Sequence, residues 1–161
     1  MSQFENDSRT TLSVLDRLVD GEPGNSSEVP VSGAESLRQL KESVRRDLEW
    51  LLNTRRRTPE ISADFKELRR SLAAFGVRDF STMSVRNSAD QDLICRALQD
   101  AIRIFEPRLR DVTVTAEKGR EFEHTLHFRI QAYLEVDPAP EQVNFDTSLQ
   151  LFSTEFKVRG E

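Results

Sequence analysis

The sequence predicts an α+β fold in which N-terminal helices precede a C-terminal antiparallel sheet of three to four strands. As far as Phe105, apolar residues recur every three or four positions, which is the period of an amphipathic helix. After Pro107 they alternate with polar residues, which is the period of a strand with one buried face. A chain whose helices come first and whose strands follow as a meander is typical of an α+β domain.

The chain has 161 residues, a formal net charge of −5 and one cysteine, Cys95. This length predicts one domain with an appendage, and a single cysteine excludes an internal disulfide framework or a cysteine-rich zinc site. No apolar run approaches the roughly 20 residues of a membrane span. The first thirty residues lack the basic-then-apolar order of a signal peptide. We therefore expect a soluble, cytoplasmic protein without membrane insertion.

Residues 1–34 are expected to form an N-terminal motif and a flexible linker, and residues 35–161 the α+β domain. The motif places apolar residues at near-helical spacing: Leu12, Val14, Leu15, Leu18 and Val19. A short helix is marginal unless it packs, so two interpretations stay open: it docks on its own domain, or it is offered to a partner. The Gly-, Pro- and Ser-rich stretch 20–33 is typical of a flexible linker.

The first helix of the domain is expected over residues 34–54. Its apolar residues form one stripe: Leu37, Leu40, Val44, Leu48, Leu51 and Leu52. Arg55, Arg56 and Arg57 suit a helix C-terminus, and Pro59 prevents continuation.

A second helix is expected over residues 62–75, with Phe65, Leu68, Leu72 and Phe75 on one side and Gly76 in a left-handed stop position. The third helix starts at Ser88–Gln91, which fits a capping box, and carries a wide apolar stripe as far as Phe105. The sequence Glu106-Pro107-Arg108 ends this helix, because a residue before proline avoids helical geometry.

The strands follow from alternation. Val112, Val114 and Ala116 precede a predicted hairpin turn at 117–120, and alternation over 126–136 predicts a long strand with one buried face. Residues 137–140 turn the chain, after which alternation places one side of the next strand at odd positions: Val143, Phe145, Thr147, Leu149 and Leu151. From Phe152 the apolar set moves to even positions, so we expect a bulge or bend near 151–153. After that bend, Phe152, Phe156 and Val158 are expected to face elsewhere.

The residue patterns of the sequence predict no catalytic, cofactor or metal site. The basic residues Arg45, Arg46 and 55–57 are interpreted as a solvated helix end, or alternatively as a contact for an acidic protein patch. Nucleic-acid binding is not expected, because no aromatic residue interleaves this cluster and the sequence pI is about 5.2. Glycoside hydrolysis needs a carboxylic acid held protonated in an apolar pocket, but the neighbour of Glu106 is Arg108, which favours the ionised form. We interpret Glu106-Pro107-Arg108 as a rigid corner that presents two opposite charges in fixed geometry.

Four stretches of sequence, 13–18, 44–56, 75–81 and 106–109, together resemble the TssE family, the baseplate subunits of bacterial type VI secretion systems. TssE is similar to the baseplate wedge subunit of contractile phage tails that was formerly called a tail lysozyme. The resemblance covers roughly residues 12–156. Arg78 departs from the family pattern, because many members have proline at this position in the local turn.

The resemblance implies a non-enzymatic role in a cytoplasmic baseplate, with TssF, TssG and TssK as wedge partners and no cofactor. It implies that Glu106, Pro107 and Arg108 dock on the core of the wedge. It also implies that the strand region initiates assembly of the TssB–TssC contractile sheath, because that region resembles the interlocking domain of sheath subunits. In the N-terminal motif, Leu15, Arg17 and Leu18 are the residues assigned to partner contact. The alternative function is a peptidoglycan-cleaving, lysozyme-like glycosidase, for which the sequence offers neither a carboxylate pair nor an export signal.

Overall fold

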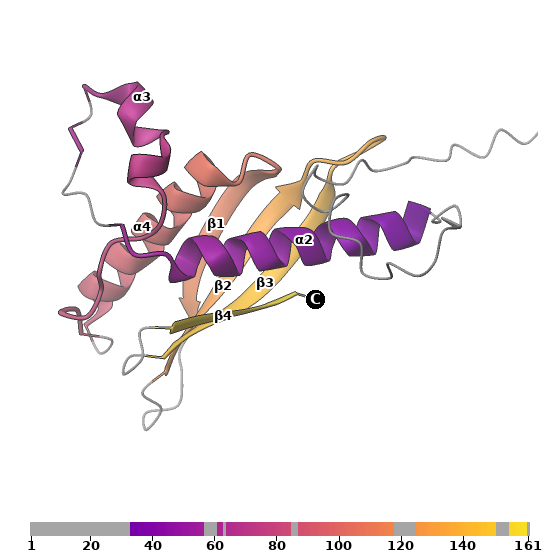
Figure 1. Cartoon of the computed structure of the whole chain (residues 1–161). Coiled ribbons are helices and arrows are strands. Elements are labelled where there is room, and N and C mark those ends of the chain that lie inside the picture. The colour runs from indigo at the N-terminus through magenta and orange to yellow at the C-terminus, as the bar shows by residue number, and fades with distance from the viewer. Residues whose placement is uncertain are drawn as a thin grey trace, which may run out of the picture.

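The computed structural model describes residues 33–56, 61–62, 64–84, 87–117, 125–150 and 155–160. Two long helices cover one face of a four-stranded antiparallel sheet whose strands lie side by side in chain order (Figure 1). The elements are α2 (Gly33–Asn53), α3 (Lys66–Arg69), η1 (Leu72–Ala74), α4 (Ser88–Phe105), β1 (Leu109–Glu117), β2 (Thr125–Leu134), β3 (Glu141–Gln150) and β4 (Glu155–Gly160). The predicted α+β fold is confirmed. Within the described residues, no helix is both long and apolar enough to cross a membrane.

The two long helices follow the predicted apolar stripes. Leu40, Val44, Leu48, Leu51 and Leu52 of α2 are buried, as are Ile94, Leu98, Ala101 and Ile102 of α4. The start of α4 differs from the prediction by one residue: the N-cap is Asn87, whose side-chain oxygen accepts a hydrogen bond from the Ala89 N–H at 3.1 Å. The predicted capping box at Ser88 is therefore wrong. Asparagine caps a helix as well as serine does, so the start signal was present one residue earlier.

The second predicted helix is wrong for most of its length. The structure has one helical turn, α3, and a 3₁₀ turn, η1, separated by extended backbone at Ser71. Phe65, Leu68 and Leu72 are exposed, and Leu72 is 88% exposed. A short helix is stabilised mainly by packing of its apolar side. In the described part of the chain, α3 projects away from the sheet and the long helices (Figure 1).

Gly76 adopts the predicted left-handed conformation, with φ of 99°. A Cβ atom at this position would lie 2.3 Å from the backbone oxygen of Thr54. The close approach is fixed on both sides, because the Val77 N–H donates to Thr54 O at 2.9 Å and the Arg56 N–H donates to Val77 O at 2.9 Å. Glycine is thus required where the segment after η1 is joined to the end of α2.

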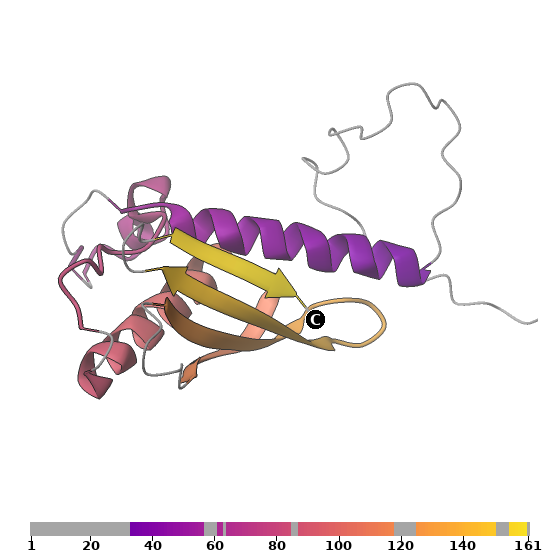
Figure 2. The same cartoon turned by 90° about the horizontal axis from the view of Figure 1, so that it is seen from below.

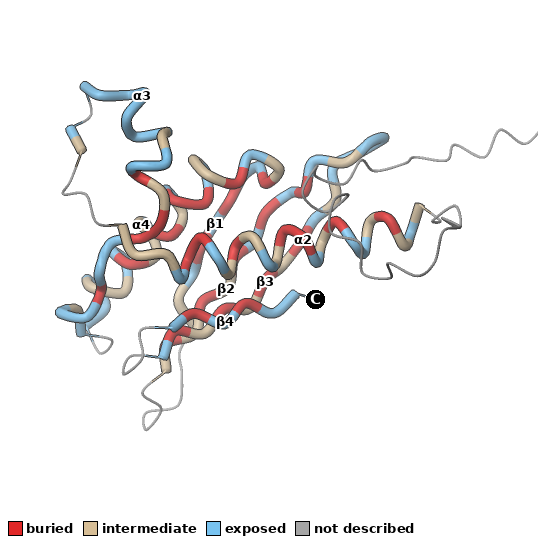
Figure 3. Tube along the Cα trace, in the orientation of Figure 1, coloured by how far each residue is buried: buried red, intermediate tan, exposed pale blue. Residues whose placement is uncertain are grey.

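The sheet buries one face against the helices. Even-numbered residues of β2 are buried from Leu126 to Leu134, and odd-numbered residues of β3 from Val143 to Leu149, as predicted. Figure 3 shows the buried positions concentrated between the sheet and the two long helices, whereas α3 is exposed. The structure adds a feature not predicted from the sequence: the β1–β2 register shifts between Arg110 and Thr113, and Asp111 has a positive φ of 51°.

The prediction for the last strand is wrong. Phe156 and Val158 are 0% and 3% exposed, and both belong to the same core as the rest of the sheet. Residues 151–154, including Phe152 and the predicted bend, lie outside the described residues. β4 is antiparallel to β3, and Leu149 pairs with Phe156. Paired residues point to the same side of the sheet, so the buried side of β3 has odd numbers and the buried side of β4 has even numbers. The change of parity therefore marks a reversal of the chain, with the same face buried before and after it.

Both outer strands receive hydrogen bonds from helix side chains. At the β4 edge, the Asn53 side chain binds both backbone groups of Phe156, at 2.8 and 2.9 Å, and Arg45 donates to Val158 O at 3.1 Å. At the β1 edge, Gln99 accepts from the Val114 N–H at 3.3 Å and Arg103 donates to Val112 O at 3.2 Å. Figure 2 shows α2 running alongside β4. Helices of the same chain thus occupy hydrogen-bonding groups that an edge strand otherwise offers to other chains.

Candidate partner-binding site

The corner between α4 and β1 is built around an ion pair. Glu106 is the C-cap residue of α4, and among the described residues it is the one buried charged side chain, 4% exposed. Arg108 binds the Glu106 carboxylate with two hydrogen bonds: Nε donates to Oε1 at 2.6 Å and Nη2 donates to Oε2 at 2.5 Å. Such a two-point guanidinium–carboxylate contact is among the strongest polar interactions in proteins. The hydrogen bond with Glu106 raises the pKa of Arg108 above its usual range, so the guanidinium stays charged.

The same arginine joins the corner to α2. Arg108 Nη2 donates to Asp47 Oδ2 at 2.6 Å, and Nη1 donates to Ser43 Oγ at 3.3 Å. The Glu135 N–H donates to Arg108 O at 2.9 Å, which attaches the corner to the residue after β2. We call Ser43, Asp47, Glu106 and Arg108 the ion-pair cluster. The guanidinium contacts the end of α4 and the side of α2, so the cluster fixes the position of the corner relative to α2.

The cluster leaves part of the corner accessible. Pro107 is exposed, and the side chains of Arg108 and Asp47 keep 27% and 29% of their surface accessible. Glu106, Pro107 and Arg108 were predicted from the sequence as partner-binding residues, and the structure places the three at one corner. The sequence did not point to the other cluster residues, Asp47 and Ser43, because no sequence pattern links α2 to a corner 61 residues away. The other assigned residues, Leu15, Arg17 and Leu18, lie outside the described residues.

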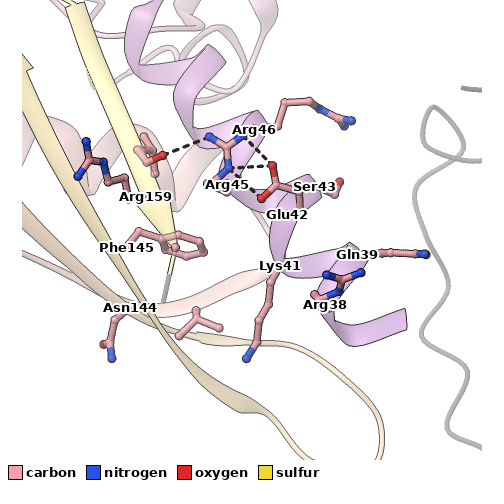
Figure 4. A pocket seen from close by; sticks show the side chains of 13 residues that line it. Arg38, Gln39, Lys41, Glu42, Ser43, Arg45, Arg46, Asn144, Phe145 and Arg159 are labelled. Carbon is pink, nitrogen blue, oxygen red and sulfur yellow. Dashed lines mark hydrogen bonds and ion pairs between the residues drawn. The ribbon is translucent and has the colours of Figure 1, made fainter. Parts of the chain in front are cut away.

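A groove of about 1070 Å³ adjoins the cluster through Ser43. Its walls are the N-terminal half of α2 and the ends of β3 and β4 (Figure 4). The lining has one acidic side chain and five basic ones: Glu42 against Arg38, Lys41, Arg45, Arg46 and Arg159. Four of these cations are paired with carboxylates: Arg38 with Glu35, Lys41 with Glu141, Arg45 with Glu42 and Glu49, and Arg46 with Asp47. Internal pairs therefore take up most of the groove's positive charge.

Cys95 is half-buried on α4, close to the β1 edge. Burial raises the pKa of its thiol, and the nearby Asp92 carboxylate raises it further. Because the thiolate is the reactive form, we expect iodoacetamide at pH 8 to alkylate Cys95 in the folded protein several-fold more slowly than in urea-denatured protein. Mass spectrometry over time measures both rates. Equal rates would contradict the partial burial of this thiol.

Comparisons with known proteins agree with this architecture. A sequence profile of the family described as baseplate wedge protein gp25 matches residues 38–139, which include the ion-pair cluster. A crystal structure from Geobacter sulfurreducens, of a protein provisionally named a tail lysozyme, superposes with a TM-score of 0.50 at 22% sequence identity. The alignment covers 78% of the present chain and 96% of the other, and at this identity it shows the shared fold. No curated protein matches the chain significantly.

The family profile spans most of the folded domain, from the first turns of α2 to the connection between β2 and β3. That span holds most of α2, all of α4, the whole ion-pair cluster and the first two strands. The chain belongs to the gp25 family of baseplate wedge proteins.

Proposed function

We propose that this protein is the TssE-type subunit of a bacterial type VI secretion baseplate, where it docks on the wedge and initiates the contractile sheath. Membership of the gp25 family supports a structural role in a baseplate. The four sequence stretches that resemble TssE support the finer assignment, with TssF, TssG and TssK as wedge partners, TssB and TssC as sheath partners, and the cytoplasmic side of the apparatus as location.

The observation that carries the proposal is the corner at Glu106-Pro107-Arg108. Arg108 joins this corner to α2 through Asp47 at 2.6 Å and Ser43 at 3.3 Å, and Pro107 is exposed. A rigid exposed corner loses little conformational entropy on binding, so it suits a permanent structural contact. In this proposal the cluster shapes the corner from inside, and its outer surface meets the wedge.

The same geometry disfavours the glycosidase alternative. A general acid must be held protonated, whereas Glu106 is bound on both oxygens by a guanidinium. We therefore propose no hydrolytic activity for this carboxylate.

Addition of a sheath strand at the β4 edge would require a hydrogen-bonding group of α2 to be displaced. Strand addition along β4 requires Asn53 to release the backbone of Phe156, where it holds two hydrogen bonds. Beyond the last described pair, Phe145 with Gly160, β3 continues through Asn144 and Val143, which line the groove beside α2. We propose this part of β3 as the place where an incoming strand aligns.

The docking test changes Pro107 and leaves the ion-pair cluster intact. Pro107→Trp adds a bulky neutral side chain at the exposed tip, and we expect it to melt like the unmodified protein and to lose co-purification with TssF and TssG. Pro140→Trp, at an exposed position before β3, is the matched control and should co-purify normally. Undiminished recovery of both partners by Pro107→Trp would overturn the assignment of the corner.

A further inference from the structure

A second cavity, of about 250 Å³, is lined by the segment that follows α2, by Arg69 of α3, by the segment that follows η1 and by one side of α4. Four arginines line it, Arg56, Arg69, Arg78 and Arg96, and Asp100 is the single acidic side chain of its described lining. We call these four residues the arginine cavity. It shares no residue with the ion-pair cluster or with the groove beside α2.

The four arginines are brought together by separate elements. Arg56 follows α2, and its backbone N–H donates to Val77 O at 2.9 Å, which places it beside the residue that precedes Arg78. Arg69 ends the short helix α3. Arg96 and Asp100 are one helical turn apart on α4 and lie on the same face. The convergence is therefore a product of the fold, and no run of basic sequence creates it.

These guanidiniums differ from those of the groove beside α2 because no described carboxylate pairs with them. Among the described residues, no carboxylate lies within ion-pair distance of Arg56, Arg69, Arg78 or Arg96. In addition, Nε of Arg56 is buried without a hydrogen-bond acceptor. A buried donor without an acceptor is costly, and a bound anion at this position would remove that cost.

The shape and charge of the cavity favour carboxylates carried on a protein. Guanidinium groups bind carboxylates and phosphates through two parallel hydrogen bonds. The lining also contains Leu93, which is 45% exposed, and Phe105, so an apolar side chain next to the acidic ones finds a contact.

We propose that the arginine cavity is a second docking site, which binds an acidic segment of a partner protein through its Asp or Glu side chains. The site goes beyond the wedge contact proposed for the Glu106 corner and does not depend on it. The arginines supply the attraction, and Leu93 together with Phe105 supplies the apolar contact.

Fluorescence polarisation with fluorescein-labelled hexaglutamate tests the proposal on the full chain. We expect binding that weakens with added salt. The Arg78→Gln/Arg96→Gln double variant should lose about tenfold or more in affinity, because it removes charged hydrogen bonds. The matched control, Arg110→Gln/Arg129→Gln, removes two positive charges from ion pairs on the sheet and should change affinity less than about twofold. Arg69→Gln, on a separate element, should also weaken binding.

The outcomes separate the possible ligands. Equal loss in the control pair, or no hexaglutamate binding by a protein that melts normally, overturns the proposal. Inorganic phosphate that stabilises the protein against heat without hexaglutamate binding overturns it in favour of a small-anion site. Tighter binding of a single-stranded DNA 12-mer than of hexaglutamate, lost in the Arg78→Gln/Arg96→Gln variant, overturns it in favour of nucleic acid.

Discussion

Replacing Arg108 with alanine is expected to lower the free energy of unfolding by about 3 kcal/mol, because it leaves the buried carboxylate of Glu106 without a partner charge. Glu106 is 4% exposed, so water reaches it poorly and cannot replace the two lost hydrogen bonds. The same change removes the link to Asp47 at 2.6 Å, so α2 and the corner also separate. Urea unfolding followed by circular dichroism measures the loss.

Two comparisons isolate the cause. The Glu106→Gln/Arg108→Met double variant removes both charges together and should recover most of the lost stability, because no charge is then left buried alone. Arg110→Ala breaks an exposed pair with Glu135, and its cost should stay below about 1 kcal/mol. Unfolding of Arg108→Ala at the same urea concentration as the unmodified protein would show that the cluster does not hold the corner.

Phe156→Ala is expected to cost about 3–5 kcal/mol, the usual range for a fully buried phenylalanine. The ring is 0% exposed, and Phe156 faces Leu149 across the last hairpin. The substitution keeps the backbone groups that Asn53 binds, so the measured loss reports the core and not the edge. Thermal and urea unfolding are both suitable measurements.

The neighbouring exposed residue provides the matched control. Lys157→Ala lies on the same strand and should change stability by no more than about 0.5 kcal/mol. A cost below about 1 kcal/mol for Phe156→Ala would mean that β4 is not part of the core. Removal of residues 152–161 should accordingly unfold the domain, in place of the intact but assembly-deficient protein that an unpaired strand would predict.

The regular elements were predictable because periodicity alone defines them. The stripe of α2 and the alternation of β2 each follow from one face being buried. The second helix failed because its apolar residues had the right spacing but no surface to pack on, and packing is a tertiary property. The move of the apolar residues from odd to even positions after Leu151 was visible in the sequence. A bulge within one strand and a hairpin between two strands both produce such a move. Without the pairing of Leu149 with Phe156, sequence could not distinguish them.

The candidate site was predictable in its local part. Glu106, Pro107 and Arg108 are adjacent, and proline marks a corner whatever surrounds it. The partner Asp47 sits on a helix face where most charged residues simply meet solvent, so its role depends on how α2 crosses the corner. The arginine cavity was not predictable at all, because residues 56, 69, 78 and 96 belong to four segments that only the fold brings together.

The hydrogen bonds that α2 and α4 place on the outer strands have a consequence for how the free subunit behaves in a crowded cell. Two copies that meet edge to edge find the backbone groups of Phe156 and Val112 already engaged, so growth into a fibre has no template there. We therefore expect that any chain that adds a strand at either edge must first displace the side chain of Asn53 or Arg103.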